Sequence, residues 1–157
     1  MARQFNREKP KEKQEYDQKL LDVTRVTRVV AGGRRFRFRV VVVVGNRQGK
    51  VGLGVAKGQD VTLSVEKAAA RARKRIMVVP IKSATIPYEV EVKYGAVRLL
   101  LKPAPVGKGI VAGGAVRAIC ELAGISNISS KILSRSKNKL NIAKATLKAL
   151  SSMRVKN

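Results

Sequence analysis

The segment from residue 34 to residue 44 most constrains the fold, because arginines alternate with apolar residues along it. The alternating pairs are Arg35-Phe36, Arg37-Phe38 and Arg39-Val40. Side chains two positions apart share one face of a strand, so the pattern predicts a strand with an arginine face and an apolar face. The segment then becomes fully apolar at residues 40–44. The sequence therefore predicts a sheet that presents an ordered row of arginines.

The charge balance restricts the class of partner. The chain has 34 Lys and Arg against 10 Asp and Glu, no histidine, and a net charge of +24 over 157 residues. A compact chain this basic repels itself unless it lies against a dense polyanion, and nucleic acid is the commonest one. Without histidine, the usual proton shuttle and the commonest metal ligand are missing. The composition favours binding over catalysis, with no cofactor, metal or small-molecule substrate expected.

Cysteine content and hydropathy suggest the compartment. Cys120 is the single cysteine, which excludes an internal disulfide, fits a reducing compartment and is expected to be a buried, small apolar residue. No apolar run approaches the roughly 18 residues that a bilayer span needs. Residues 1–19 have no apolar core and therefore do not form a secretory signal. We expect a soluble intracellular protein.

Hydrophobic periodicity and turn residues divide the chain into three parts. Residues 1–19 form a charged, solvated arm. Residues 20–83 form a domain with strands at 23–30, 36–44 and 50–56 and a helix at 61–77, for which Asp60 is the expected N-cap. In its third strand Gly52, Gly54 and Ala56 leave one face almost bare, so another backbone can approach closely.

The second predicted domain comprises residues 84–157. Strands are expected at 88–93 and 96–101, followed by a Gly/Pro-rich loop at 103–114, a helix at 115–123 that Gly124 ends, a strand near 125–133 and a helix at 141–153. The overall prediction is two small α+β domains.

The glycine-rich loop is a second candidate site for an anion. Residues 107–112 match the G-x-G-x-x-G/A dinucleotide pattern, but residues 127–131 lack the acidic group that would hold a ribose. Exposed amides at a helix N-terminus, with Lys108 beside them, would suit a phosphate, and RNA backbone is the favoured occupant.

Other charged groups are less specific. For Lys67, Arg71 and Lys74 on one face of the first helix, a solvated surface and an RNA contact both remain open. Glu89 and Glu91 share a strand face and are expected to be solvated or paired with Lys and Arg rather than to act as a catalytic pair. No catalytic residue is predicted.

Four segments resemble the bacterial small-subunit ribosomal protein five family. They are residues 26–36 (VTRVVAGGRRF), 51–54 (VGLG), 109–117 (GIVAGGAVR) and 121–125 (ELAGI). The resemblance covers residues 20–150 and implies a domain similar to double-stranded-RNA-binding domains, a β-sheet plus a helix, followed by a C-terminal β/α sandwich domain. Arg135 and Lys139 depart from the family's usual Gly and Pro, which makes the loop before the last helix more basic.

The resemblance also implies partners and roles. They are small-subunit (16S-type) rRNA, the small-subunit proteins four and eight, mRNA near the path by which it enters the subunit, assembly of the 30S particle, and a cytoplasmic ribosomal location in a bacterium or organelle. Gly109 and Arg117 inherit an expected role in translational accuracy at the interface with protein four. The residues expected to contact RNA are Arg25, Arg28, Gly32, Gly33, Arg34, Arg35, Arg37, Arg39, Arg47, Lys50, Lys57, Lys108, Gly109, Gly113, Gly114 and Lys137.

Two other classes of protein compete with this interpretation. A general DNA-compacting protein would explain the charge but not the ordered glycine loops. A nicotinamide-dependent enzyme would require the cofactor to bind at the loop.

Overall fold

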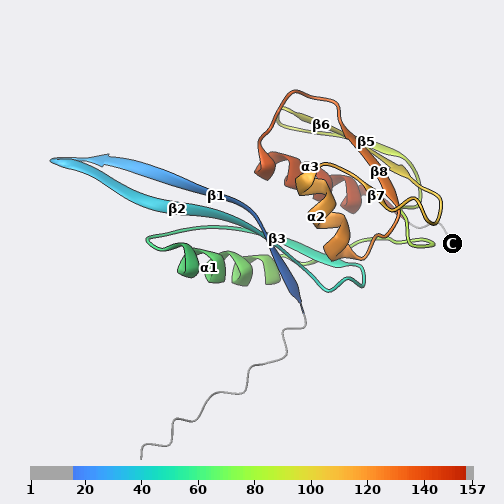
Figure 1. Cartoon of the computed structure of the whole chain (residues 1–157), viewed down its shortest axis with the longest axis horizontal. Coiled ribbons are helices and arrows are strands. Elements are labelled where there is room, and N and C mark those ends of the chain that lie inside the picture. The colour runs from blue at the N-terminus through green and yellow to red at the C-terminus, as the bar shows by residue number, and fades with distance from the viewer. Residues whose placement is uncertain (1–15, 155–157) are drawn as a thin grey trace, which may run out of the picture.

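The computed structural model describes residues 16–154, which form two four-stranded sheets and three helices. The first sheet has the order β1-β2-β3-β4, and the second has the order β5-β6-β8-β7 (Figure 1). In chain order the elements are β1 (Asp17–Val30), β2 (Gly33–Gly45), β3 (Lys50–Gly58), α1 (Val61–Arg73), β4 (Met77–Val78), β5 (Val90–Tyr94), β6 (Val97–Pro103), β7 (Ile110–Val111), α2 (Gly114–Ala123), β8 (Ile128–Ile132) and α3 (Lys139–Ser152). The predicted α+β class is confirmed.

Helix α1 covers one face of the first sheet at very close range. A Cβ atom added to Gly54 would collide with the carbonyl oxygen of Ala68, and one added to Gly52 would collide with that of Ala72. The backbone of α1 therefore lies directly against the face of β3 that carries Gly52 and Gly54. This confirms the prediction that another backbone approaches that face closely. The buried side of α1 consists of small residues, Ser64, Ala68, Ala69 and Ala72.

Strands β1 and β2 continue past the rest of the first sheet. The β2–β3 pairing ends at Phe38 and Gly58, whereas β1 and β2 remain paired as far as Val30 and Gly33. Residues 26–37 therefore form a two-stranded β-ribbon, which projects from the body of the molecule (Figure 1). Phe36 lies in this β-ribbon with 46% of its surface exposed, so the apolar face of β2 is buried only from Val40 onward.

The second unit packs α2 and α3 against its sheet. Helix α3 contacts β5 and β6, and α2 contacts both α3 and β7. Gly124 ends α2 in the left-handed conformation (φ 89°), as predicted. Cys120 is fully buried in α2, and burial raises the pKa of its thiol to about 12, so it is an unreactive core residue as expected.

The two units share one hydrophobic core. Val43 and Val51 of the first sheet belong to the same buried cluster as Ile119 of α2. The turn between β2 and β3 also caps the C-terminal end of α2, because Arg47 N–H donates to Leu122 O (2.8 Å) and Gly49 N–H donates to Ala123 O (2.8 Å). The β-ribbon lies at the opposite end of β2 from this joint.

Several element boundaries differ from the predictions. Strand β1 begins at Asp17, so the last three residues assigned to the 1–19 arm belong to a strand; residues 1–15 of that arm lie outside the described residues. Helix α1 ends at Arg73 rather than at 77. Helix α3 begins two residues early because Asn138 Oδ1 accepts from Leu140 N (3.1 Å) and Asn141 N (3.4 Å). The domain boundary between 83 and 84 stays a prediction.

Candidate nucleic-acid interface

Strand register gathers five predicted RNA-binding cations on one face of the first sheet. Partners in an antiparallel ladder share a face, and Arg28 pairs with Arg35 while Arg39 pairs with Lys57. Side chains alternate along β2, so Arg37 shares this face with Arg35 and Arg39. We call these five residues the basic face. A pocket of about 500 Å³ is lined by Arg28, Arg35, Arg37 and Lys57, together with Val26, Thr27 and Val30.

No described carboxylate neutralises the basic face. The six ion pairs of residues 16–154 join Asp17, Asp22, Glu89, Glu91 and Glu121 to cations elsewhere. Asp60 caps α1, where its Oδ1 accepts from Val61 N (2.7 Å), and Glu66 is exposed on α1 and belongs to none of these ion pairs. Arg39 Nε is also buried without a hydrogen-bond partner. Five cations that repel one another and have no internal counter-ion form a surface that an external polyanion would stabilise.

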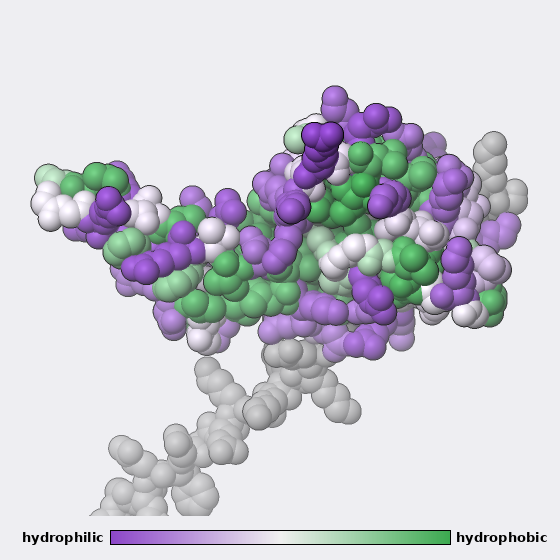
Figure 2. All heavy atoms as spheres, turned by 45° about the horizontal axis from the view of Figure 1, so that its top comes forward, coloured by the Kyte–Doolittle hydropathy of each residue, from purple (hydrophilic) through white to green (hydrophobic). Residues whose placement is uncertain are grey.

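The other face of the first two strands carries the remaining predicted arginines of this region. The guanidinium of Arg25 stacks 3.7 Å from the centroid of the Phe36 ring, a cation–π contact that holds both side chains on the surface. Arg34 is exposed opposite Val29, which is 78% exposed. Figure 2 shows hydrophilic and hydrophobic residues mixed along the β-ribbon.

The tip of the β-ribbon is sterically open. Gly32 has a φ of 83°, which favours glycine, and a Cβ atom added to Gly32 or Gly33 would meet nothing within 4 Å. The tip can therefore lie closely against another molecule.

The glycine-rich loop is not the exposed amide cradle that the sequence predicts. Gly107 N–H and Gly109 N–H both donate to Asn127 Oδ1 (3.1 Å each), and Lys108 N–H donates to Pro105 O (3.2 Å). Asn127 is buried, and a buried amide needs hydrogen-bond partners, which the loop supplies. The anion site proposed for these three amides is therefore wrong, although the exposed Lys108 side chain remains available.

Gly113 and Gly114 lie at the start of α2 and are exposed. A Cβ atom added to Gly114 would meet nothing within 4 Å, and one added to Gly113 would make an ordinary contact (3.4 Å) with Ile132. The glycines that lie closely against backbone of this chain are Gly45, Gly52, Gly54 and Gly124.

Arg117 takes part in a small charged network that links the two units. Its Nε lies 3.1 Å from Glu121 Oε1, and Lys19 Nζ of β1 lies 2.9 Å from Glu121 Oε2. The hydrogen bond from Lys19, reinforced by Arg117, holds the pKa of Glu121 below its usual range. Arg117 therefore braces α2 and is not an isolated surface cation.

The other predicted site residues lie elsewhere. Arg47 is in the β2–β3 turn, paired with Asp17 (2.8 Å), and Lys50 begins β3 at the same end of the sheet. Lys137 lies in the loop before α3. Glu89 forms an ion pair with Lys102, and Glu91 forms one with Arg98. This confirms the prediction that these carboxylates pair with Lys and Arg.

Clusters of metal-ligating side chains and membrane-spanning helices are both absent from the described residues. In the described part of the chain, no three His, Cys, Asp or Glu side chains lie together as metal ligands would. None of the helices within residues 16–154 has the length and apolar character to cross a membrane.

Comparisons with known proteins match both units. The family model for the N-terminal domain of ribosomal protein S5 matches residues 16–80, and that for its C-terminal domain matches residues 92–156. The small ribosomal subunit protein uS5 of Thermus thermophilus is 49% identical over 142 residues, covering 90% of this chain and 87% of the relative. The uS5 protein of Campylobacter jejuni is also 49% identical, covering 90% of this chain and 96% of the relative. The uS5 protein of Thermotoga neapolitana is 48% identical over 137 residues, covering 87% of this chain and 76% of the relative. The chain belongs to the ribosomal protein S5 family.

Proposed function

We propose that the chain is a structural constituent of the small ribosomal subunit that holds rRNA through the basic face and has no enzymatic activity. The observation that carries the proposal is the set of five cations aligned by register on β1, β2 and β3 without a described carboxylate partner. Family membership supports the subunit, and the geometry supports the RNA contact.

The chemistry of the basic face suits a phosphate backbone. Each arginine guanidinium can donate two parallel hydrogen bonds to the oxygens of one phosphate. Successive side chains on one strand face are about 7 Å apart, so each arginine can reach a separate phosphate or ribose hydroxyl. The described aromatic residues are few and Phe36 is already stacked on Arg25, so contacts to backbone and shape fit better than base stacking.

The finer roles are part of the same proposal. They are support of 30S assembly, a contact with small-subunit protein four near Gly109 and Arg117 that influences translational accuracy, a contact with protein eight, a contact with mRNA near the path by which it enters the subunit, and a place in the cytoplasmic ribosome of a bacterium. The position of Arg117 supports the interface role. Its side chain is exposed on α2, and its Nη1 donates to the carbonyl oxygen of Ile110 (3.4 Å), the residue after Gly109.

Co-sedimentation with small ribosomal subunits in high salt tests this function. We expect the chain to remain with the particle, and to bind 16S-type rRNA more tightly than duplex DNA of equal length at the same salt concentration. Equal affinity for the two nucleic acids, or loss of the chain from the particle at moderate salt, would favour a general nucleic-acid-compacting protein instead.

A further inference from the structure

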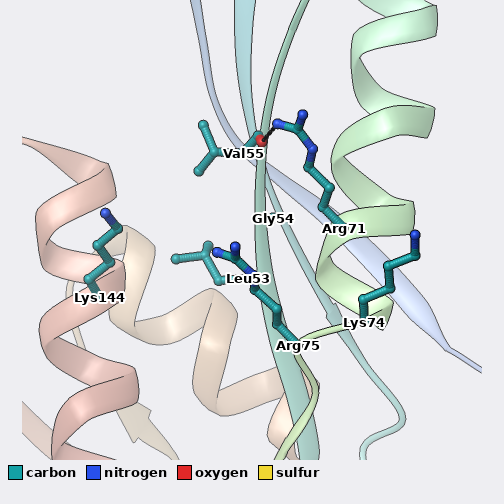
Figure 3. Close-up of a pocket in the computed structure, with 7 residues that line it drawn as sticks. All are labelled: Leu53, Gly54, Val55, Arg71, Lys74, Arg75 and Lys144. Carbon is teal, nitrogen blue, oxygen red and sulfur yellow. Dashed lines mark hydrogen bonds between the residues drawn. The ribbon is translucent and has the colours of Figure 1, made fainter.

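A second basic pocket lies between the two units, away from the β-ribbon. It has a volume of about 550 Å³ and is lined by four cations, Arg71, Lys74, Arg75 and Lys144, around Leu53, Gly54 and Val55 of β3. Figure 3 shows Arg71 of α1 and Lys74, the residue that follows this helix, on one side of β3 and Lys144 of α3 on the other. No carboxylate is among its lining residues.

The free edge of β3 fixes one of these cations. Strand β4 pairs only with Lys50 and Val51, so the rest of the outer edge of β3 has no strand partner. Arg71 Nη1 donates to the Val55 carbonyl oxygen on this edge (2.8 Å), which fixes the guanidinium at the pocket and leaves its other N–H groups available.

Lys144 brings the second unit into the same pocket. Its ammonium lies 5.7 Å from the centroid of the Tyr94 ring of β5, and its side chain is half-buried. The six ion pairs of residues 16–154 include none of Lys74, Arg75 and Lys144. The cluster therefore resembles the basic face in having charge without an internal counter-ion.

Strand β3 connects the pocket to the basic face. Leu53, Val55 and Lys57 are two residues apart along β3, so their side chains share a face, and Lys57 pairs with Arg39. The row of cations that begins at Arg28 and Arg35 therefore continues through Lys57 to the pocket between the units.

We infer that this pocket binds phosphate groups of an RNA backbone as a continuation of the basic face, so that both units hold the same RNA segment. The inference rests on the proposed rRNA-binding function and adds a site to it. Lys144 is the residue that gives the second unit a share in this contact, which would hold the two units in a fixed orientation on the RNA.

Salt-dependent binding of the full chain to small-subunit particles depleted of it tests the inference. The variant Arg75→Gln/Lys144→Gln removes one pocket cation from each unit, and neither side chain makes a described hydrogen bond. The control Arg73→Gln/Lys131→Gln removes one exposed cation from each unit outside the pocket. We expect the slope of log affinity against log salt to fall by roughly two units for the pocket variant and not for the control.

Crosslinking separates RNA from a protein partner. Because Cys120 is buried with a raised thiol pKa, a cysteine introduced by Lys74→Cys would be labelled selectively with a photoreactive group. We expect crosslinks to rRNA. Crosslinks only to a ribosomal protein, or equal slopes for the pocket variant and its control, would overturn the inference while leaving the basic face as the RNA site. Failure of the unmodified chain to bind the particles would overturn the proposed function as well.

Discussion

Arg39 and Lys57 lie directly opposite each other in the β2–β3 ladder, on the same face of the sheet. Like charges placed this way destabilise a sheet, and no described acid lies in an ion pair with either residue. The pair joins the β-ribbon to the pocket between the units. This arrangement is unfavourable in the free protein, and a bound polyanion, as proposed above, would relieve the repulsion.

The Arg39–Lys57 pair predicts opposite effects on stability and binding. Lys57→Glu would replace a repulsive cross-strand pair with an attractive one, and we expect the free protein to gain about 0.2–1 kcal/mol. Affinity for depleted small-subunit particles should fall in the same variant. Thermal unfolding and particle binding measure the two effects, with Lys131→Glu on β8 as the control. If Lys57→Glu neither gains stability nor loses affinity, the result would contradict this role for the pair.

The close approach of α1 to β3 predicts a severe effect from one methyl group. In Gly54→Ala the new Cβ atom would collide with backbone, which cannot move as a side chain can. We therefore expect the free energy of unfolding to fall by about 3 kcal/mol or more. Gly114→Ala is the control, since open space surrounds that position at the start of α2. Urea unfolding of both variants measures the difference; equal stabilities would show that α1 can move away.

The hydrogen bonds of Asn127 predict a local effect on the glycine-rich loop. Asn127→Ala would leave the amides of Gly107 and Gly109 without their acceptor, and we expect stability to fall by about 0.5–1.5 kcal/mol for each hydrogen bond lost. Hydrogen exchange at these two amides should accelerate, whereas Ser126→Ala should leave it unchanged. Unchanged exchange in Asn127→Ala would mean that another group holds the loop.

The Glu121 network predicts a pH-dependent contribution to stability. The pKa of Glu121 is lowered in the folded protein, so its ion pairs with Lys19 and Arg117 stabilise the fold at pH values above the unfolded-state pKa. That contribution is lost as the pH falls through the folded-state pKa. We expect wild type to exceed Glu121→Gln in stability near neutral pH and the difference to shrink in acid. Urea unfolding at several pH values measures it, and a pH-independent difference would contradict the network.

Local patterns in the sequence predict much of the fold. The features that they do not predict depend on contacts between residues far apart in the chain. Alternation around Arg37 gave the strand and its faces, and Gly54 gave the close helix contact. Alternation cannot show how far neighbouring strands extend, so the exposure of Phe36 was not foreseen. Asn127 captures loop amides through a contact with no sequence signature. Arg75 and Lys144 come from different units, and only the tertiary structure places them in one pocket.

The salt dependence of binding by a basic-face variant tests the central claim most directly. In Arg28→Gln/Arg35→Gln/Arg37→Gln three cations leave one face of the β-ribbon, while Arg73→Gln/Lys93→Gln/Lys131→Gln removes the same charge elsewhere. With depleted small-subunit particles, we predict that the slope of log affinity against log salt falls by roughly three units for the first variant and stays near the wild-type value for the second. Equal slopes for the two variants would mean that net charge alone binds the RNA, and would contradict a site built by strand register.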